Sequence, residues 1–311
     1  MACEAFAECY VAVHTEQELR QALSYAHAQG QEVCILGGGS NVIFMSLRQG
    51  LLIHLLNKGR SCKPIEKRHR VSFSEPHLKP HHNSCEQAKT DASSPGHSQE
   101  CFRVTAAAGE NWHEFVLWTL QQGLRGLENL SLIPGTVGAA PIQNIGAYGV
   151  ELARHIESVQ AIHKITLEVK QFSPEQCRFG YRDSVFKRSA VNWIIWQVTF
   201  ILSPSTPLVT DYAELQNGWQ QLGCPDEALA ISQLVCGLRQ RKLPDPAALP
   251  NSGSFFKNPL VHPAHYRRLQ QQFPGLVCYP QADGRYKLAA GWLIEQAGWK
   301  GYQQAGVGVC A

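Results

Sequence analysis

The chain has little charge and no long apolar run, and each shortage excludes a class of protein. Of its 311 residues 17% are charged, and 28 Lys and Arg against 25 Asp and Glu leave a formal net charge of +3. A balance this close to zero gives no electrostatic basis for nucleic acid or an anionic membrane as a default partner. The best apolar run, Trp193 to Leu202, is interrupted by Gln197 and Thr199 and is far shorter than the ~20 residues of a membrane-spanning helix. We therefore expect no nucleic-acid partner and no membrane span.

A secretory signal and a disulfide framework are also missing. The N-terminal stretch carries Glu4 and Glu8 where a secretory signal has basic residues before an apolar segment. The 11 cysteines are odd in number, scattered from Cys3 to Cys310, and include no C-x-x-C pair. Free thiols in a reducing compartment explain this distribution better than disulfides do. We expect a cytoplasmic protein.

Length and composition predict more than one folded unit. A chain of 311 residues exceeds what one hydrophobic core usually serves, and an apolar content of 44% is typical of globular proteins. Residues 15–30 are predicted to form a helix, because Thr15 and Glu18 make a capping-box pattern before an apolar stripe. The other expected elements are strands at 32–36, 51–56, 102–108, 155–170 and 193–202 and helices at 110–122 and 228–239.

Residues 59–100 differ sharply in composition from the rest of the chain. They contain few large apolar residues among Ser, Pro, His and mixed charge, so they cannot bury a core. The histidines and cysteines match no standard zinc spacing, and Phe73 is the only aromatic residue, which argues against stacking on nucleic acid. We expect a disordered insertion between two strands, and no metal site.

Two uncharged glycine-rich loops are the densest chemical signal. The first begins at Gly37 directly after a predicted strand, and its missing side chains let backbone amides approach a ligand. Alone it reads more readily as a tight turn, and it is not a Rossmann fingerprint because Val42 stands where a glycine is required. The second loop, 133–149, has four glycines, two prolines and no charge. Together the loops suggest a diphosphate held by amides and a flat ring covered by backbone.

Five motifs in order resemble the family of UDP-N-acetylenolpyruvoylglucosamine reductases. They are GGGSN at 37–41, the loop at 133–149, GYRDSVFK at 180–187, GSFFKNP at 253–259 and KLAAGWLI at 287–294. Outside 59–100 the resemblance covers nearly the whole chain, and it is strongest to the subset with a tyrosine-bearing loop, here 279–284. Members of this family, also called UDP-N-acetylmuramate dehydrogenases, use NADPH and noncovalent FAD to reduce the enolpyruvyl ether of UDP-N-acetylglucosamine enolpyruvate in peptidoglycan synthesis.

The resemblance implies a fold and a division of the chain. The fold is α+β, with a two-lobed FAD-binding domain of the vanillyl-alcohol-oxidase/PCMH type and a smaller C-terminal α/β substrate-binding domain. Lobe 1 is expected at 1–58, the insertion at 59–100, lobe 2 at 101–243 and the substrate-binding domain at 244–311. The expected partners are the sugar nucleotide and NADPH, and the expected state is a monomer.

The resemblance assigns catalysis to Arg182 and Ser254. A guanidinium keeps its proton and forks onto a carboxylate, which suits Arg182 to the charge that develops on the substrate. Ser254 is expected to donate a proton to the adjacent carbon after hydride addition. Without the resemblance, Arg182 reads as a surface arginine paired with an acid such as Asp183, and Ser254 reads as a turn residue.

The other implied contacts form two groups. Those to the flavin come from the two glycine-rich loops: Gly37, Gly38, Gly39, Ser40, Asn41, Ile133, Pro134, Gly135, Gly138, Ala140, Gln143, Asn144, Gly146 and Ala147. Those to the substrate are Tyr181, Tyr212, Lys242, Asn258 and Tyr279. Lys242 stands beside Arg239 and Arg241, and this cluster also suits a helix end that the helix dipole stabilises.

Two departures from the family pattern concern the ends of the chain. The family begins with a strand bearing an Asn-Thr-Phe turn, and we expect Met1 of this chain to stand downstream of it. The family ends with a strand, a helix and a final strand that carries a catalytic Glu, whereas residues 297–311 contain no acidic residue. We therefore expect both pieces to be missing and turnover to be impaired or absent. The alternative is a non-catalytic flavin- or nucleotide-binding remnant, or an interaction protein that uses the 59–100 insertion.

Overall fold

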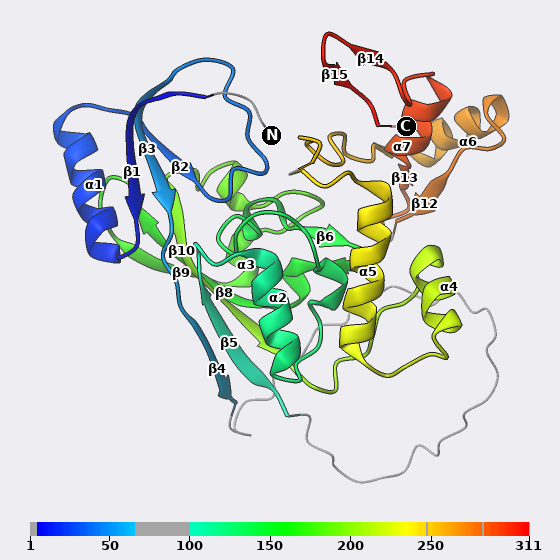
Figure 1. The fold of residues 1–311 in the computed structure, drawn as a ribbon, viewed down its shortest axis with the longest axis horizontal. Helices are drawn as coiled ribbons and strands as arrows, with labels where there is room; N and C mark the ends of the chain where they lie inside the picture. Colours follow the sequence, from blue (N-terminus) through cyan, green and yellow to red (C-terminus); the bar gives the residue numbers. More distant parts are fainter. Residues whose placement is uncertain (1–4, 66–99, 247, 282, 311) are drawn as a thin grey trace. The chain divides into compact units, whose positions relative to one another are not determined.

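The computed structural model describes residues 5–65, 100–246, 248–281 and 283–310 (Figure 1). The described chain divides into two compact units, the first ending at Ser252 and the second beginning at Gly253. The mixture of helices and sheets in these units is that of an α+β protein, as the sequence predicted.

The first unit begins with a small parallel sheet covered by one helix. The sheet has the order β1-β3-β2, and α1 lies against it (Figure 1). The apolar stripe of α1 shares a core cluster with the sheet strands. Thr15 and Glu18 form both hydrogen bonds of a capping box, which confirms the predicted start of the helix. These elements are β1 (Ala7–Val13), α1 (Glu16–Ala28), β2 (Val33–Leu36) and β3 (Arg48–Leu55).

A five-stranded antiparallel sheet forms the larger part of the first unit. Its order is β4-β5-β10-β8-β9, and β10 pairs with β5 on one side and β8 on the other. The apolar run at 193–202 is therefore the central strand of this sheet. The strands are β4 (Arg60–Pro64), β5 (Phe102–Ala107), β8 (Ile156–His163), β9 (Val169–Phe172) and β10 (Trp193–Leu202).

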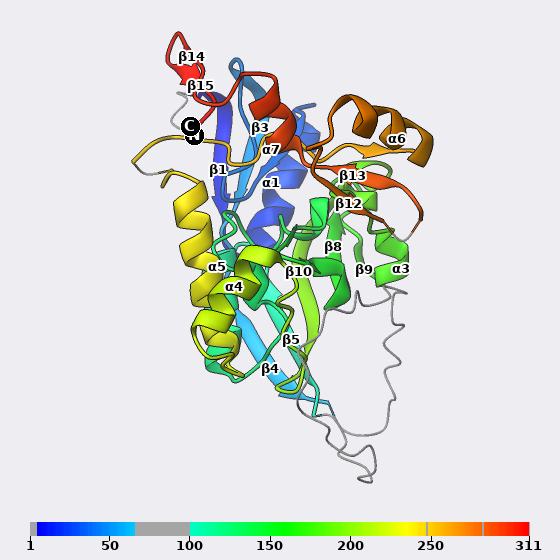
Figure 2. The ribbon, with the colours of Figure 1, turned by 90° about the vertical axis from the view of Figure 1, so that its right-hand side faces the viewer.

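Helices cover this sheet and extend the core. In α2, Trp112 and Phe115 pack against Phe200 of β10, with ring centroids 5.2 to 6.4 Å apart. Two further helices, α4 and α5, lie side by side in both views (Figures 1 and 2). They share a small apolar cluster around Leu215 and Ile231. The helices are α2 (Trp112–Gln121), α3 (Pro174–Cys177), α4 (Ala213–Gln221) and α5 (Ala228–Lys242), and a two-residue hairpin joins β6 (Gly146–Ala147) to β7 (Val150–Glu151).

Two sequence predictions need correction. The insertion expected at 59–100 is wrong for residues 60–64, which form the edge strand β4 and pair with β5. An edge strand needs few apolar residues because backbone hydrogen bonds to one neighbour hold it, so composition did not reveal it. The remainder of that insertion, 66–99 with its histidines, lies outside the described residues. The run 155–170 is two strands, since Leu167 turns the chain with a left-handed φ of 57°.

Within the described residues, the second unit contains a three-stranded sheet of order β11-β13-β12, two helices and a short hairpin. Tyr266 of α6 stacks on Tyr286 of β13, with ring centroids 3.9 Å apart. Its elements are β11 (Leu260–Val261), α6 (Pro263–Gln272), β12 (Cys278–Pro280), β13 (Tyr286–Leu288), α7 (Ala290–Gln296), β14 (Gln303–Gln304) and β15 (Val307–Gly308).

Two features of the described ranges bear on the sequence predictions. None of their helices combines the length and the apolar character that crossing a bilayer requires. The nine cysteines within these ranges all carry free thiols.

Candidate functional site

The two glycine-rich loops contact each other backbone to backbone. A Cβ atom added to Gly37 would lie 2.8 Å from Thr136 Oγ1, and one added to Gly38 would lie 3.1 Å from Gly135 Cα. In the opposite direction, a Cβ on Gly135 would lie 3.1 Å from Ser40 Oγ. A side chain on Gly37, Gly38 or Gly135 would have no room at this junction, so these three positions contribute backbone alone to it. The structure therefore brings together two loops that the sequence identified separately.

The turn between β5 and α2 is hydrogen-bonded to the second loop. The Val137 and Gly138 amides donate to the Glu110 and Ala108 carbonyls, each over 2.9 Å, and the Gly135 carbonyl accepts from Trp112 over 3.1 Å. A Cβ on Gly138 would lie only 2.5 Å from that of Ala108, so glycine is required where the loop crosses the strand end.

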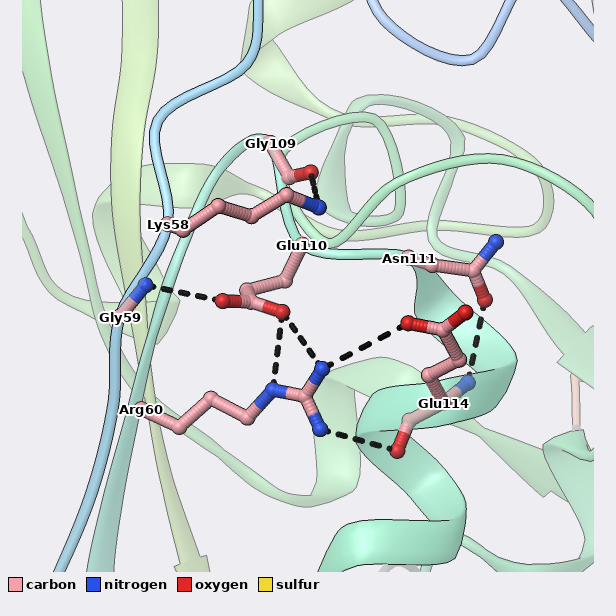
Figure 3. A network of polar contacts seen from close by, with 7 residues as sticks. All are labelled: Lys58, Gly59, Arg60, Gly109, Glu110, Asn111 and Glu114. Atoms are coloured by element: carbon pink, nitrogen blue, oxygen red, sulfur yellow. Dashed lines mark hydrogen bonds and ion pairs between the residues drawn. The ribbon is translucent and has the colours of Figure 1, made fainter. Parts of the chain in front are cut away.

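A buried carboxylate fixes this turn to the start of β4 (Figure 3). Glu110 accepts from the Gly59 amide over 2.8 Å and from Arg60 Nε and Nη2 over 2.8 and 2.7 Å. Beside it, Lys58 Nζ donates to the Gly109 carbonyl over 2.6 Å. Burial alone would raise the pKa of Glu110, but the hydrogen bonds from Gly59 and Arg60 outweigh it and lower that pKa. Glu110 is thus a charged residue that fixes the turn to which the second loop is bonded.

Two helices hold the entrance of the second loop at Leu132. The Leu132 amide donates to His113 Nδ1 of α2 over 3.0 Å, and its carbonyl accepts from Arg239 Nε of α5 over 3.2 Å. Leu132 has a left-handed φ of 58°, a backbone conformation that costs energy in any residue other than glycine. Burial, with a smaller contribution from the Arg239 charge, lowers the pKa of His113, so Nδ1 stays available as an acceptor. The two side chains stabilise a strained residue just before the loop.

Arg182 lies against the middle of the second loop. It occupies a tight turn closed by paired backbone hydrogen bonds between Gly180 and Asp183, and its own φ is +54°. Its guanidinium donates to the Gly146 carbonyl and, over 3.4 Å, to the Asn144 carbonyl. The guanidinium carbon also lies 5.6 Å from the ring centroid of Tyr181. The alternative in which Arg182 pairs with Asp183 is wrong, because Asp183 pairs with Arg188 instead.

The end of the second loop meets two predicted substrate residues. Tyr148 packs edge to face on Tyr212, with ring centroids 5.1 Å apart, and Lys242 Nζ lies 5.5 Å from the Tyr212 ring centroid. Lys242 also pairs with Glu214 over 2.6 Å. Burial alone would lower the pKa of Lys242, but hydrogen bonds to Glu214 and Tyr212 raise it. Lys242 is therefore a fixed cation at neutral pH.

The second unit carries the remaining predicted residues. Ser254 lies in an exposed loop after Gly253, whose φ is +59°. The Asn258 Oδ1 atom accepts from the Ala290 amide at the start of α7 over 2.9 Å. Tyr279 stands on β12, with Lys287 Nζ 6.0 Å from its ring centroid. Tyr279 and Lys287 thus share one part of this unit's sheet.

Sequence reasoning missed three residues that shape the site: Glu110, His113 and Ser184. The sequence signal that could have found Glu110 is a carboxylate directly after Gly109 in a chain with few charges. Ser184 is 1% exposed, and its hydroxyl donates to the Ile142 carbonyl over 2.6 Å. The motif around Arg182 pointed to this segment of the chain but gave no sign of that hydrogen bond. No pattern distinguished His113. Among the residues that the structure describes, no cluster of three or more His, Cys, Asp or Glu suits a metal ion.

Comparisons with known proteins agree with this geometry. The model of the FAD binding domain matches residues 7–76 and 96–165, and that of the UDP-N-acetylenolpyruvoylglucosamine reductase C-terminal domain matches 245–311. The crystal structure of UDP-N-acetylenolpyruvylglucosamine reductase from Thermus caldophilus superposes with a TM-score of 0.54 at 21% identity, covering 95% of this chain and 75% of that one.

Relatives at the sequence level are closer. The UDP-N-acetylenolpyruvoylglucosamine reductase of Pseudomonas putida is 44% identical over 96% of this chain and 78% of its own length. Those of Pseudomonas aeruginosa and Azoarcus sp. are 42% and 43% identical, each over 95% of this chain and 78% of its own length.

The fold and the paired loops define an FAD-binding protein of the α+β class. Its paired glycine-rich loops fit that cofactor, because a Cβ atom at Gly37, Gly38 or Gly135 would meet the opposite loop, and only glycine lets the two backbones lie together as an anion site built from amides requires. The identity to its relatives is high over nearly the whole chain. The chain belongs to the UDP-N-acetylenolpyruvoylglucosamine reductase family.

Proposed function

We propose that this chain is an FAD-dependent oxidoreductase that reduces UDP-N-acetylenolpyruvoylglucosamine to UDP-N-acetylmuramate in peptidoglycan synthesis, with NADPH as the hydride donor. The supporting observation is the position of the second glycine-rich loop. Its start contacts the first loop, its middle receives Arg182, and its end packs Tyr148 against Tyr212 beside Lys242. One loop thus touches the groups proposed for the flavin, for the substrate carboxylate and for the nucleotide. The setting proposed for this reaction is the cytoplasm, with the chain acting as a monomer.

The residues proposed to hold FAD are those of the two glycine-rich loops. Backbone amides of 37–41 would bind its diphosphate, and the second loop from Ile133 to Ala147 would cover its ring. Bound there, FAD supplies the hydride that reduces the carbon–carbon double bond. The loops need no charged side chain for this task, because amide groups that point into a loop form an anion site.

Arg182 is proposed to bind the carboxylate of the enolpyruvyl group. A guanidinium has five N–H donors, and its contacts with the carbonyls of Asn144 and Gly146 leave other donors for a forked pair with a carboxylate. That pair stabilises the negative charge that accumulates on the carboxylate side during reduction. Lys242 and Tyr212 are proposed to bind the diphosphate and uracil, together with Tyr181, Asn258 and Tyr279.

Ser254 is proposed to donate a proton to the carbon next to the one that receives the hydride. An isolated serine hydroxyl is a weak acid, so this step requires alignment with the substrate and nearby donors. Lys257 and Asn258 follow Ser254 within the same motif and are placed in sequence to supply such donors. The proton leaves the Ser254 oxygen and the new C–H bond completes the reduction.

Anaerobic half-reactions test the proposal. The purified protein should carry the visible absorbance of flavin, NADPH should bleach it, and UDP-N-acetylenolpyruvoylglucosamine should restore it with stoichiometric formation of UDP-N-acetylmuramate. UDP-N-acetylglucosamine, which lacks the enolpyruvyl group, is the control and should restore nothing. Bound flavin that the substrate does not reoxidise would instead identify a non-catalytic flavin-binding protein.

A further inference from the structure

The side chain of Asn144 makes all its hydrogen bonds inside the protein. It is 1% exposed, and its Nδ2 donates to Glu151 Oε2 and to the Gly180 carbonyl, each over 3.1 Å. Its Oδ1 accepts from the Ala153 amide over 2.9 Å. An asparagine amide has two N–H donors, and both are used. Although Asn144 stands in the proposed flavin loop, its side chain has no donor left for a flavin.

The bonds of Asn144 lead to the turn that carries Arg182. Its Nδ2 holds the Gly180 carbonyl, which closes that turn, and its own carbonyl accepts from Arg182 Nη1. Arg182 and Asn144 both have left-handed backbones, with φ of +54° and +42°, and such a conformation persists where surrounding contacts fix it. The Asn144 side chain is therefore one of the contacts that hold Arg182 in an otherwise unfavourable conformation.

A second contact holds the other side of the same turn. Ser184 is 1% exposed, and its hydroxyl donates to the Ile142 carbonyl over 2.6 Å. Gly146, whose carbonyl also accepts from Arg182, has no space for a side chain, since a Cβ there would lie 2.9 Å from the Val150 carbonyl oxygen and 3.0 Å from Arg182 Nη1. The turn 180–184 is thus fixed to residues 142–146 on both sides of the arginine.

We propose that the side chain of Asn144 positions Arg182 and is not itself a flavin ligand. It keeps the guanidinium at the angle at which its remaining donors can fork onto the substrate carboxylate. Orientation matters because a forked pair is directional, and a misplacement of about 1 Å in an active site costs on the order of 100-fold in rate. This inference rests on the proposed function, in which Arg182 binds that carboxylate.

Two variants test it. Asn144→Gly removes the amide and tolerates the left-handed backbone, and Asn144→Asp keeps the size but turns a carboxylate toward Glu151 and the Gly180 carbonyl. In both we expect reoxidation of the reduced flavin by UDP-N-acetylenolpyruvoylglucosamine to slow about 10- to 100-fold. Reduction by NADPH and the Kd for FAD should stay within about threefold of wild type, since the side chain does not touch the flavin. Arg182→Lys should slow the same half-reaction at least as much.

Asn57 provides a matched control. It is a buried asparagine of the first unit, 3% exposed, that donates to the Trp196 carbonyl and accepts from the Gly109 amide, each over 3.0 Å. Asn57→Ala should lower the Tm as the Asn144 variants do but leave the ratio of the two half-reaction rates unchanged. An Asn144 variant with a Kd for FAD raised tenfold or more, or with both half-reactions slowed equally, would overturn the positioning role. Wild-type protein that the substrate fails to reoxidise would overturn the proposed function and this inference together.

Discussion

His113 Nδ1 accepts the amide proton of Leu132, at 3.0 Å, on the residue that precedes the second glycine-rich loop. Replacing His113 by Phe removes the acceptor and leaves the amide of a strained residue without it. We expect the free energy of unfolding to fall by about 1–3 kcal/mol at pH 8, the usual cost of an unsatisfied buried donor.

The effect of His113→Phe should depend on pH in one direction. The pKa of His113 is lowered in the fold, so the unfolded chain binds the proton more readily. The contribution of His113 to stability is therefore fully present above its ordinary pKa and declines as pH falls below that value. Urea unfolding at pH 8 and pH 5 should therefore show a smaller difference between wild type and variant at pH 5. A difference that grows toward acid would contradict the neutral state of His113.

The pair between Arg60 and Glu110 should contribute to stability through its charge. Glu110→Gln keeps an acceptor for the Gly59 amide but loses the charge that Arg60 binds, so we expect a loss of about 1–3 kcal/mol at neutral pH. The pKa of Glu110 is lowered, so its contribution is present above the ordinary carboxyl value of 4.5 and is lost as pH falls further. Wild type and variant should thus converge in acid.

Glu114→Gln is the control for that measurement. Glu114 lies 3.7 Å from the same arginine but is 66% exposed, and an exposed pair contributes less than about 1 kcal/mol. Chemical denaturation of both variants across pH separates the buried contact from the exposed one. Equal losses in the two variants would show that burial of Glu110 adds nothing.

Because the two glycine-rich loops contact each other, a side chain inserted between them should weaken flavin binding. In Gly38→Ala, the new Cβ would lie 3.1 Å from Gly135 Cα, and backbone on both sides must separate to admit it. We expect the Kd for FAD to rise at least about tenfold, or ~1.4 kcal/mol, in a titration of apoprotein.

Gly275→Ala is the matched control for the loop junction. Gly38 and Gly275 both lack a left-handed φ, but a Cβ at Gly275 meets nothing within 4 Å. Its Kd for FAD should equal that of wild type. A Gly38→Ala protein with unchanged Kd would mean that the loop junction does not approach the cofactor.

Ser254→Ala should separate the two half-reactions. Reduction by NADPH should proceed at the wild-type rate, whereas reoxidation by the substrate should slow by roughly 100-fold or more, because only the second step requires a proton from Ser254. Stopped-flow absorbance measures both rates. Equal slowing of the two would remove Ser254 from the role of proton donor.

Short local sequence patterns predicted most of the helices and strands of the first unit. The capping box at Thr15 and the apolar run of β10 are signals within short windows, and the structure confirms both elements. β4 and α4 were missed for a different reason. β4 is held by backbone bonds to β5, and α4 buries only Leu215 of its own residues, so neither has a strong apolar pattern.

The candidate site divides in the same way. The sequence by itself determined where side chains are missing, because glycine at 37, 38 and 135 is a property of the chain, and it determined that an arginine would stand in the motif at 180–187. Only the tertiary structure decided that Glu110 meets Gly59 across 51 positions, that His113 holds Leu132, and that Asn144 directs its amide to the turn of Arg182. A hydrogen bond between distant segments depends on angles and distances that form only after the sheets and helices pack.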